Sequence, residues 1–231
     1  MRGDATMLRQ CNAHLYFRGN YCPICGEEGK FLLNESEMEH IGKILSGILR
    51  HFPERYNIKL TEDGWAEIRD ILRAIQSKHK RYRWLRMHHI VGIIQTDEKG
   101  RYQIVEGKIR ATYGHSINVT LDLPKDEIPD KLYYPSSPEE YPILLENGLS
   151  PSDRRKVHLS KTIEQAVEAG KVRVDNPVIL EIDVKKAQEE GITIMKAGKT
   201  VYLADNIPTK CIRKVELETG SENEEKHGTV N

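Results

Sequence analysis

The sequence lacks both a net charge and any long hydrophobic run. Its 231 residues include 35 basic and 35 acidic side chains, so the formal net charge is zero. Its longest apolar stretches resemble residues 90–94, far short of the roughly 20 residues that span a bilayer. These absences exclude a membrane-spanning class and a histone-like binder whose affinity rests on overall charge. No secretory signal follows Met1, so we expect a cytoplasmic protein.

Cysteine is scarce, and its placement favours a metal site over disulfides. Three of the four cysteines, Cys11, Cys22 and Cys25, crowd together with His14, whereas Cys211 lies far along the chain. Two pairs of ligands, each separated by two residues, are typical of tetrahedral zinc. Four protein ligands would close the site, which predicts a structural Zn²⁺. The alternative is two unrelated pairs of reduced side chains in an unstructured N-terminal segment.

Acidic residues are absent from residues 71–95, although basic residues are frequent there. The basic residues of this window are Arg73, Lys78, Lys80, Arg81, Arg83 and Arg86, and Tyr82 and Trp84 lie between them. A cationic patch with aromatic side chains is what a nucleic-acid backbone would select. The alternative is a solvated basic helix face.

The first half of the chain has the pattern of three helices followed by a hairpin. Apolar residues recur at helical spacing over residues 38–49, 65–75 and 82–94, and strands are predicted at 101–105 and 108–111. These are the parts of a winged helix, a module that often binds nucleic acid.

The second half alternates short strands with helices, which predicts a mixed α/β lobe and an α+β protein overall. Helices are predicted at residues 142–147 and 162–169. We therefore divide the chain into a zinc knuckle (1–34), a winged-helix lobe (35–123), an α/β lobe (124–217) and a disordered acidic tail (218–231).

Arginine and histidine recur together in three places. These groups are Arg50 with His51, Arg110 followed by His115 and Ser116, and Arg154 followed by His158. If they converged, their guanidinium groups would form an anion site suited to phosphoryl chemistry. Taken singly, each arginine is better explained by a structural salt bridge than by an anion site.

These motifs resemble the RNA 2'-phosphotransferase family, whose members use NAD⁺ to remove an internal 2'-phosphate from RNA. The resemblance covers about residues 38–216, so the zinc knuckle is expected to lie outside it. The matching motifs are Leu45-Ser46 to Leu49-Arg50-His51, Asp63-Gly64-Trp65, Asp97-Glu98-Lys99-Gly100-Arg101-Tyr102, Ile109-Arg110-Ala111-Thr112-Tyr113-Gly114-His115-Ser116, Gly148-Leu149 leading to Arg154, and Val157-His158-Leu159-Ser160. The resemblance implies a winged-helix RNA lobe joined to an ADP-ribosyltransferase lobe.

The resemblance also implies the roles of individual residues. The catalytic set falls on Arg50, His51, Arg110 and Arg154. The NAD⁺ contacts fall on His158, Ser160, Tyr134 and Gly148. Contacts to RNA phosphates are assigned to His115, Ser116, Lys99 and Arg101, together with the basic patch at Lys80, Arg81 and Arg83. The implied partner is a tRNA-like RNA, as in tRNA splicing.

One segment departs from the family pattern. Where the family usually has Leu-Tyr-His-Gly-Thr, this chain has Leu132-Tyr133-Tyr134-Pro135-Ser136. The Tyr134 hydroxyl can still donate a hydrogen bond, but Pro135 has no backbone N–H. Two other functions therefore stay open: a non-catalytic nucleic-acid-binding protein, and an ADP-ribosyltransferase that modifies nucleic-acid terminal phosphates. ADP-ribosylation of protein is the least favoured.

Overall fold

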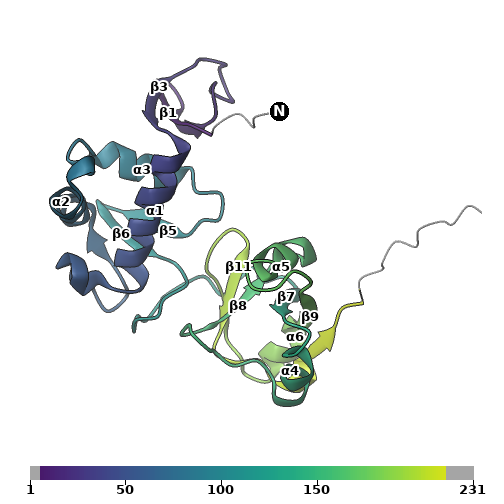
Figure 1. Cartoon of the computed structure of the whole chain (residues 1–231). Coiled ribbons are helices and arrows are strands. Elements are labelled where there is room, and N and C mark those ends of the chain that lie inside the picture. The colour runs from purple at the N-terminus through teal and green to yellow at the C-terminus, as the bar shows by residue number, and fades with distance from the viewer. Residues whose placement is uncertain (1–5, 217–231) are drawn as a thin grey trace, which may run out of the picture.

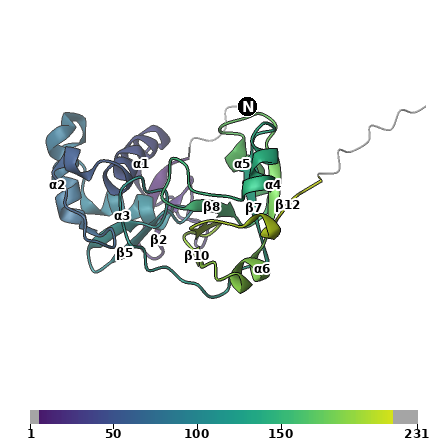
Figure 2. The same cartoon turned by 90° about the horizontal axis from the view of Figure 1, so that it is seen from below.

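The computed structural model describes residues 6–216 as a small N-terminal sheet and two lobes (Figure 1, Figure 2). The predicted disordered tail falls in residues 218–231, outside the described part. No helix among the described residues is long and apolar enough to cross a membrane.

The N-terminal sheet is antiparallel with the order β2-β1-β3. Its strands are β1 (Leu8–Cys11), β2 (Leu15–Arg18) and β3 (Lys30–Leu33). Leu8, Leu32 and Leu33 are all buried in the same hydrophobic core as the helices of the first lobe. The boundary predicted at residue 34 therefore lies between two β-sheets that share one hydrophobic core.

The first lobe contains three helices and then a hairpin, in the order expected from the sequence. Its elements are α1 (Glu35–Arg50), η1 (Pro53–Tyr56), β4 (Ala66–Glu67), α2 (Ile68–Lys78), η2 (Lys80–Tyr82), α3 (Met87–Gln95), β5 (Tyr102–Val105) and β6 (Lys108–Ala111). The strands form a second antiparallel sheet, β4-β6-β5.

Helix α1 begins and ends at signals present in the sequence. Asn34 accepts from the backbone N–H of Glu37, whose carboxylate accepts from the backbone N–H of Asn34, so two free N–H groups are satisfied at the start of the helix. The helix ends at Arg50, shortly before Pro53. Its apolar face is buried along its whole length, which fixes where Arg50 and His51 emerge.

The second lobe is built on a six-stranded antiparallel sheet with the order β10-β11-β8-β7-β9-β12. Its elements are β7 (Lys131–Ser136), α4 (Tyr141–Asn147), β8 (Val157–Ser160), α5 (Ile163–Gly170), β9 (Val178–Asp183), α6 (Val184–Glu189), β10 (Ile194–Lys196), β11 (Val201–Ala204), η3 (Thr209–Cys211) and β12 (Ile212–Lys214).

The sheet of the second lobe is split between its two central strands. Strand β7 pairs with β9 over six residues, but it pairs with β8 only between Tyr133 and Ser160. Beyond that point β7 and β8 diverge, which opens space at the end of the sheet that faces the first lobe.

Two helix starts differ from the sequence prediction. The second helix begins at Ile68 and not near Trp65, because Ala66 and Glu67 pair with β6 as a short strand. The third begins at Met87 and not near Tyr82, because residues 80–82 form a separate 3-10 turn.

Candidate functional site

A cleft of about 840 Å³ lies where the two lobes meet. The first lobe lines it with Arg50, Lys99, Tyr113 and Gly114, and the second lobe contributes the residues around the split between β7 and β8. Its size is in the range of pockets that hold small molecules and cofactors.

Arg50, the last residue of α1, brings a buried positive charge to this cleft. Its guanidinium lies 4.9 Å from the ring centroid of Tyr113 and 5.6 Å from that of Tyr102. Its Nε and Nη2 atoms are buried, and the described residues offer them no hydrogen-bond partner. Burial lowers the pKa of Arg50. Two free donors on a desolvated cation call for an anionic ligand.

Arg154 places a second guanidinium beside the first. Its Nη1 atom donates to the carbonyl of Gly114 at 2.6 Å, which joins the second lobe to the first. A Cβ atom at Gly114 would lie 3.1 Å from Nη1 of Arg50 and 3.3 Å from Nη1 of Arg154. Because Gly114 has no side chain, the guanidinium groups of both arginines can lie against its backbone. Gly114 also has a positive φ of 84°, a conformation that favours glycine.

His158 on β8 offers a hydrogen-bond acceptor to the cleft. Its Nδ1 lies 2.9 Å from the carbonyl of Lys156, which can only accept, so Nδ1 carries the proton. Burial, followed by the charge of Arg154, lowers the pKa of His158 to about 4, so the ring is neutral at pH 7. Its buried Nε2 has no partner among the described residues and is therefore free to accept a hydrogen bond from a hydroxyl group.

Tyr134 and Ser160 line the same cleft, as the sequence predicts. Burial raises the pKa of Tyr134, so its hydroxyl keeps its proton and can donate at neutral pH. Pro135 also lines the cleft, opposite Ile179 of β9. The departure from the family pattern therefore lies in the wall of the cleft itself.

His51, like His115 and Ser116, does not line the cleft, although it directly follows Arg50. Its Nδ1 lies 3.0 Å from the Ser116 hydroxyl, and the backbone N–H of Ser116 donates to the carbonyl of Arg50 at 3.0 Å. Burial, then the charges of Arg154 and Arg50, lower the pKa of His51. The neighbouring His115 is buried with an unpartnered Nε2, and burial lowers its pKa to about 4. Both imidazoles are therefore neutral at pH 7.

Arg110 and Gly148, two predicted site residues, do not line the cleft. Arg110 donates from Nε to Gln103 at 2.8 Å and from its other nitrogens to two backbone carbonyls, and it stacks 4.6 Å from the Trp65 ring. Its donors are thus engaged within the first lobe. Gly148 ends α4, where a Cβ would lie only 2.5 Å from the carbonyl oxygen of Ile207. Close packing explains this glycine without a ligand.

Lys99 and Arg101, both predicted to bind phosphate, differ in their availability. Lys99 lines the cleft and forms an exposed ion pair with Glu168 across the two lobes, at 3.2 Å. Arg101 is held by the buried Asp97 through its Nε and Nη2 atoms, and the pair lowers the pKa of that carboxyl. The Arg101 charge is therefore already neutralised.

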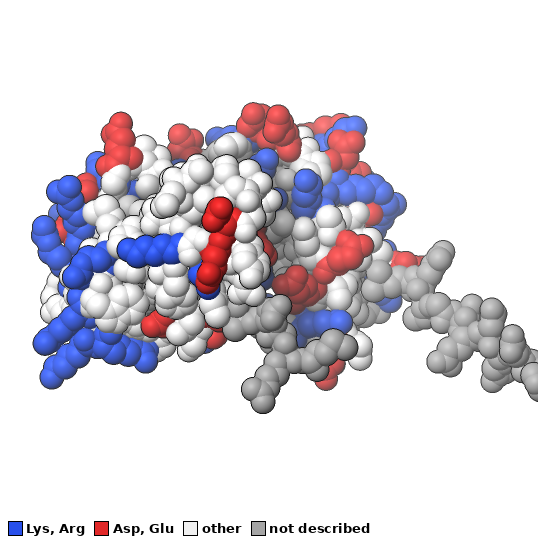
Figure 3. Space-filling view, turned by 90° about the horizontal axis from the view of Figure 1, so that it is seen from above, with Lys and Arg blue, Asp and Glu red and all other residues white. Residues whose placement is uncertain are grey.

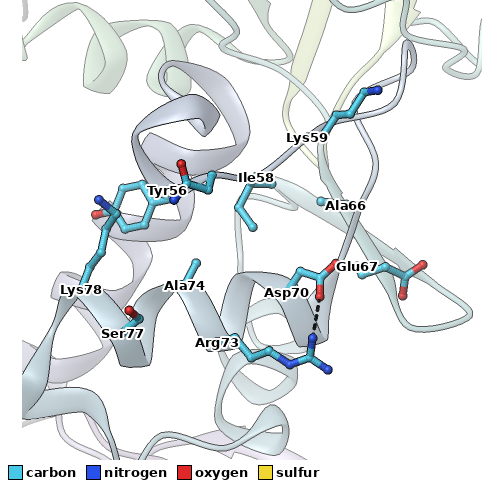
Figure 4. A pocket seen from close by; sticks show the side chains of 11 residues that line it. Tyr56, Ile58, Lys59, Ala66, Glu67, Asp70, Arg73, Ala74, Ser77 and Lys78 are labelled. Atoms are coloured by element: carbon cyan, nitrogen blue, oxygen red, sulfur yellow. Dashed lines mark hydrogen bonds and ion pairs between the residues drawn. The ribbon is translucent and has the colours of Figure 1, made fainter.

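The basic patch lies away from the cleft, on η2 and the residues that follow it. Lys80, Arg81 and Arg83 are exposed, and none of them pairs with an acidic group within residues 6–216. The view in Figure 3 shows basic side chains gathered at the left edge of the molecule, the side of the first lobe. A second hollow, of about 460 Å³, lies between η1, β4 and α2 in this lobe (Figure 4).

The four predicted metal ligands lie together in the N-terminal sheet. The ligand atoms of Cys11, His14, Cys22 and Cys25 are all within 4.8 Å of one another. The Sγ atom of Cys11 is 3.6 Å from both His14 Nδ1 and Cys25 Sγ, close to the separation of about 3.8 Å between sulfurs around tetrahedral zinc. Backbone N–H groups of the turn contribute most to lowering the pKa of Cys22 to about 6. The cluster can therefore hold a metal ion.

Sequence reasoning missed Tyr113 as a site residue. Its ring lies against the Arg50 guanidinium and meets His158 edge-on, with centroids 6.0 Å apart, so it touches both lobes at once. Its position directly before Gly114, in a motif that matches the family pattern, could have identified it as a site residue.

Comparisons with known proteins show which family the chain is similar to. A model of the family described as "RNA 2'-phosphotransferase, Tpt1 / KptA family" matches residues 36–206. A "Probable RNA 2'-phosphotransferase" of Methanosarcina barkeri is 44% identical over 91% of this chain and 100% of its own. "Probable RNA 2'-phosphotransferase 1" of Archaeoglobus fulgidus is 43% identical over 90% and 94%, respectively.

These alignments also change one expectation about the N-terminal segment. The family model begins at residue 36, as expected for an added knuckle. An alignment that covers 210 of 231 residues, however, begins no later than residue 22. The similarity to the Methanosarcina protein therefore reaches into residues 1–34.

Proposed function

The chain belongs to the RNA 2'-phosphotransferase family, and on that premise we propose that it transfers an internal RNA 2'-phosphate to NAD⁺. In this proposal the first lobe is a winged-helix RNA-binding lobe and the second is an ADP-ribosyltransferase-like lobe. The products are RNA with a 2'-hydroxyl, nicotinamide and ADP-ribose 1'',2''-cyclic phosphate.

The reaction has two steps, and each is balanced by the two substrates. An oxygen of the RNA 2'-phosphate attacks the anomeric carbon of the nicotinamide ribose, and the bond to nicotinamide breaks. The 2''-hydroxyl of that ribose then loses its proton and attacks the phosphorus, while the RNA 2'-oxygen leaves and takes up a proton. Cationic donors aimed at the phosphoryl oxygens stabilise the charge in the second step.

The observation that carries the proposal is the pair of arginines at the cleft. Arg50 has two buried donors without a partner, and Arg154 lies next to it across Gly114. Asp153 pairs with Arg154 at 3.5 Å, but no acidic group of the described residues pairs with Arg50, so the desolvated Arg50 charge is unfavourable without a ligand. A phosphate dianion between the two arginines would offset this cost.

Two further side chains suit the NAD⁺ end of the cleft. His158 Nε2 is a buried, unpartnered acceptor suited to a ribose hydroxyl, and the neutral Tyr134 hydroxyl is a donor suited to the nicotinamide amide. These contacts need no backbone N–H from Pro135.

The experiment is a time course with an RNA that carries one ³²P-labelled internal 2'-phosphate. We expect the label to leave the RNA only when NAD⁺ is present, with one nicotinamide released per phosphate. Arg154→Ala should slow this release, whereas Arg69→Ala, which removes an exposed arginine of α2, should not.

Other outcomes would identify the alternatives. Release of inorganic phosphate without NAD⁺ would indicate a phosphatase, and ADP-ribose attached to a terminal phosphate would indicate the nucleic-acid ADP-ribosyltransferase. RNA binding without any turnover would indicate the non-catalytic binding protein.

We also propose that the metal held by Cys11, His14, Cys22 and Cys25 is Zn²⁺, which prefers a tetrahedral set of thiolate and imidazole ligands. Four protein ligands leave no position for a substrate, so its role would be structural. We propose a tRNA-like RNA as the partner and the cytoplasm as the location.

A further inference from the structure

A row of aromatic rings and basic side chains crosses the first lobe in two groups, one at Phe52 and Arg55 and one from Tyr56 to Trp84, which are joined through η1. We call it the cation–aromatic stripe, and its members are Phe52, Arg55, Tyr56, Lys78, His79, Arg81, Tyr82 and Trp84. They come from the ends of α1 and α2 and from the two 3-10 helices η1 and η2.

The stripe begins next to His51, the residue that follows the cleft-lining Arg50. The rings of His51 and Phe52 are 6.0 Å apart, and the Arg55 guanidinium lies 4.7 Å from the Phe52 ring. One turn further along η1, the Tyr56 ring carries the Lys78 ammonium at 5.6 Å. A cation therefore lies over the face of each of these two rings. The same cation can also pair with a phosphate group nearby.

The stripe continues through His79 to an exposed indole. The His79 ring stacks on the Tyr56 ring, with the ring centroids 5.9 Å apart. The Nε2 atom of His79 also forms a hydrogen bond with the Tyr56 hydroxyl at 3.0 Å. The Tyr82 ring follows at 6.3 Å, but it is only 4% exposed and belongs to the hydrophobic core, so it supports its neighbours and does not itself stack on a base. Arg81 lies 4.8 Å from this ring, and Trp84 meets it edge-on at 6.3 Å. The Trp84 side chain is 40% exposed, which is unusual for so large an apolar group.

The cations of the stripe contact aromatic rings but no acidic group of the described residues. Arg55, Lys78 and Arg81 are exposed, and in the described part of the chain none of them forms an ion pair. Basic residues on neighbouring positions do pair: Lys43 with Glu39 and Arg73 with Asp70. The acidic group nearest in sequence, Glu54, is exposed on η1 and is also unpaired. Positive charge therefore remains available along the row.

The length of the stripe can be measured along α1. The His40 ring lies 5.8 Å from Tyr82, and ten residues of helix separate His40 from Arg50, which corresponds to about 15 Å. At roughly 3.4 Å per phosphate along one strand, this is about four or five nucleotides. The hollow of about 460 Å³ borders the stripe at Tyr56 and Lys78, where a base could enter (Figure 4).

The geometry points to a second binding site for the same RNA: the cation–aromatic stripe holds the single strand that flanks the 2'-phosphate, through base stacking and phosphate contacts. Single strands are bound in this way by rows of rings and cations. This inference rests on the proposed function for the identity of the RNA, and it predicts that RNAs too short to leave the cleft bind weakly.

The test uses the full chain and RNAs that lack a 2'-phosphate, in the absence of NAD⁺, so that no chemistry is required. Fluorescence anisotropy would measure the affinity for single-stranded RNAs of 3 to 12 nucleotides at several salt concentrations. The stripe variant is R55A/K78A/R81A. The matched control is K125A/K186A/K214A, which removes the same charge from exposed positions of the second lobe and its linker that form no ion pair among the described residues.

We expect the affinity of the wild type to rise steeply up to about six nucleotides. The stripe variant should lose this rise, and its salt slope should decrease by about 2, at 0.7 per phosphate contact. Trp84→Ala should weaken binding by roughly 5- to 150-fold, the effect of one stacked base. The control variant should behave like the wild type.

Three results would overturn the inference: equal affinity for 3 and 12 nucleotides, equal losses in the stripe and control variants, or tighter binding of a duplex than of the single strand. The outcome is separable from that of the proposed function. Length-dependent binding without NAD⁺-dependent turnover would support the stripe as a binding site and contradict the proposed reaction. Turnover without length-dependent binding would support the reaction and contradict the stripe.

Discussion

Arg50 and Arg110 should have opposite effects on stability, although the sequence assigns both to the catalytic set. Arg50 carries two buried donors without a partner, whereas Arg110 donates three hydrogen bonds within the first lobe. The same substitution, Arg→Met, tests both positions. It keeps much of the side-chain volume and removes the charge.

The magnitudes follow from these contacts. Removing the Arg50 charge relieves about 1–3 kcal/mol for each unsatisfied donor and loses about 1–2 kcal/mol of cation–π attraction. We expect Arg50→Met to stabilise the protein by about 1–2 kcal/mol. At about 2–4 °C per kcal/mol for a chain of this size, the melting temperature rises by roughly 2–8 °C. Arg110→Met leaves three acceptors without a donor and exposes Trp65, which should lower stability by about 2–4 kcal/mol.

The assay combines thermal unfolding with turnover of 2'-phosphorylated RNA. Arg50→Met should be more stable than the wild type and inactive, as expected for a residue that is strained without its ligand. If Arg50→Met is destabilised as much as Arg110→Met, Arg50 has a structural partner and the phosphate site is wrongly placed.

Three other predictions concern the metal, the order of the chemistry and the pH. Cys22→Ser should remove zinc from the purified protein, measured by metal analysis, and lower the melting temperature, because β1 shares the core of the first lobe. Arg154→Ala should slow the second step more than the first, so that the RNA–phospho–ADP-ribose intermediate accumulates on a gel; near wild-type turnover without it would contradict this. His115 and His158 have pKa values of about 4 in the fold, below the usual 6.5. The two neutral rings therefore contribute fully to stability above pH 6.5. Between pH 6.5 and pH 4 the free energy of unfolding decreases by up to about 1.4 kcal/mol per histidine for each pH unit. Urea denaturation at several pH values would measure this decrease. A flat profile over that range would show that folding does not lower the pKa values of these two rings.

The sequence predicted the features that depend on regular spacing. The apolar repeat of α1, the hairpin of β5 and β6 and the four metal ligands all lie where their patterns placed them. These signals are local, so no knowledge of the fold was needed to interpret them.

The missed features depend on contacts between distant segments. The two-residue strand β4 exists only because β6 lies beside it, and it delays the start of α2. Likewise, the sequence motif that contains Arg110 gives no sign that Gln103 and two carbonyls occupy its donors. Gly148 was assigned to the cleft because it lies in a matching segment, and only the position of Ile207 shows its packing role.

The shared core of the N-terminal sheet and the first lobe affects how the chain is made on the ribosome. Leu8 of β1 packs against Gly92 of α3, where a Cβ would lie 3.0 Å from the leucine side chain. Synthesis proceeds at about 5–20 residues per second, so α3 emerges roughly 4–16 seconds after β1. The four residues that could hold a metal ion, in contrast, are complete at Cys25, long before α3 exists. A metal bound there would fix the position of Leu8 early, and the sheet would then be the surface on which the helices of the first lobe assemble.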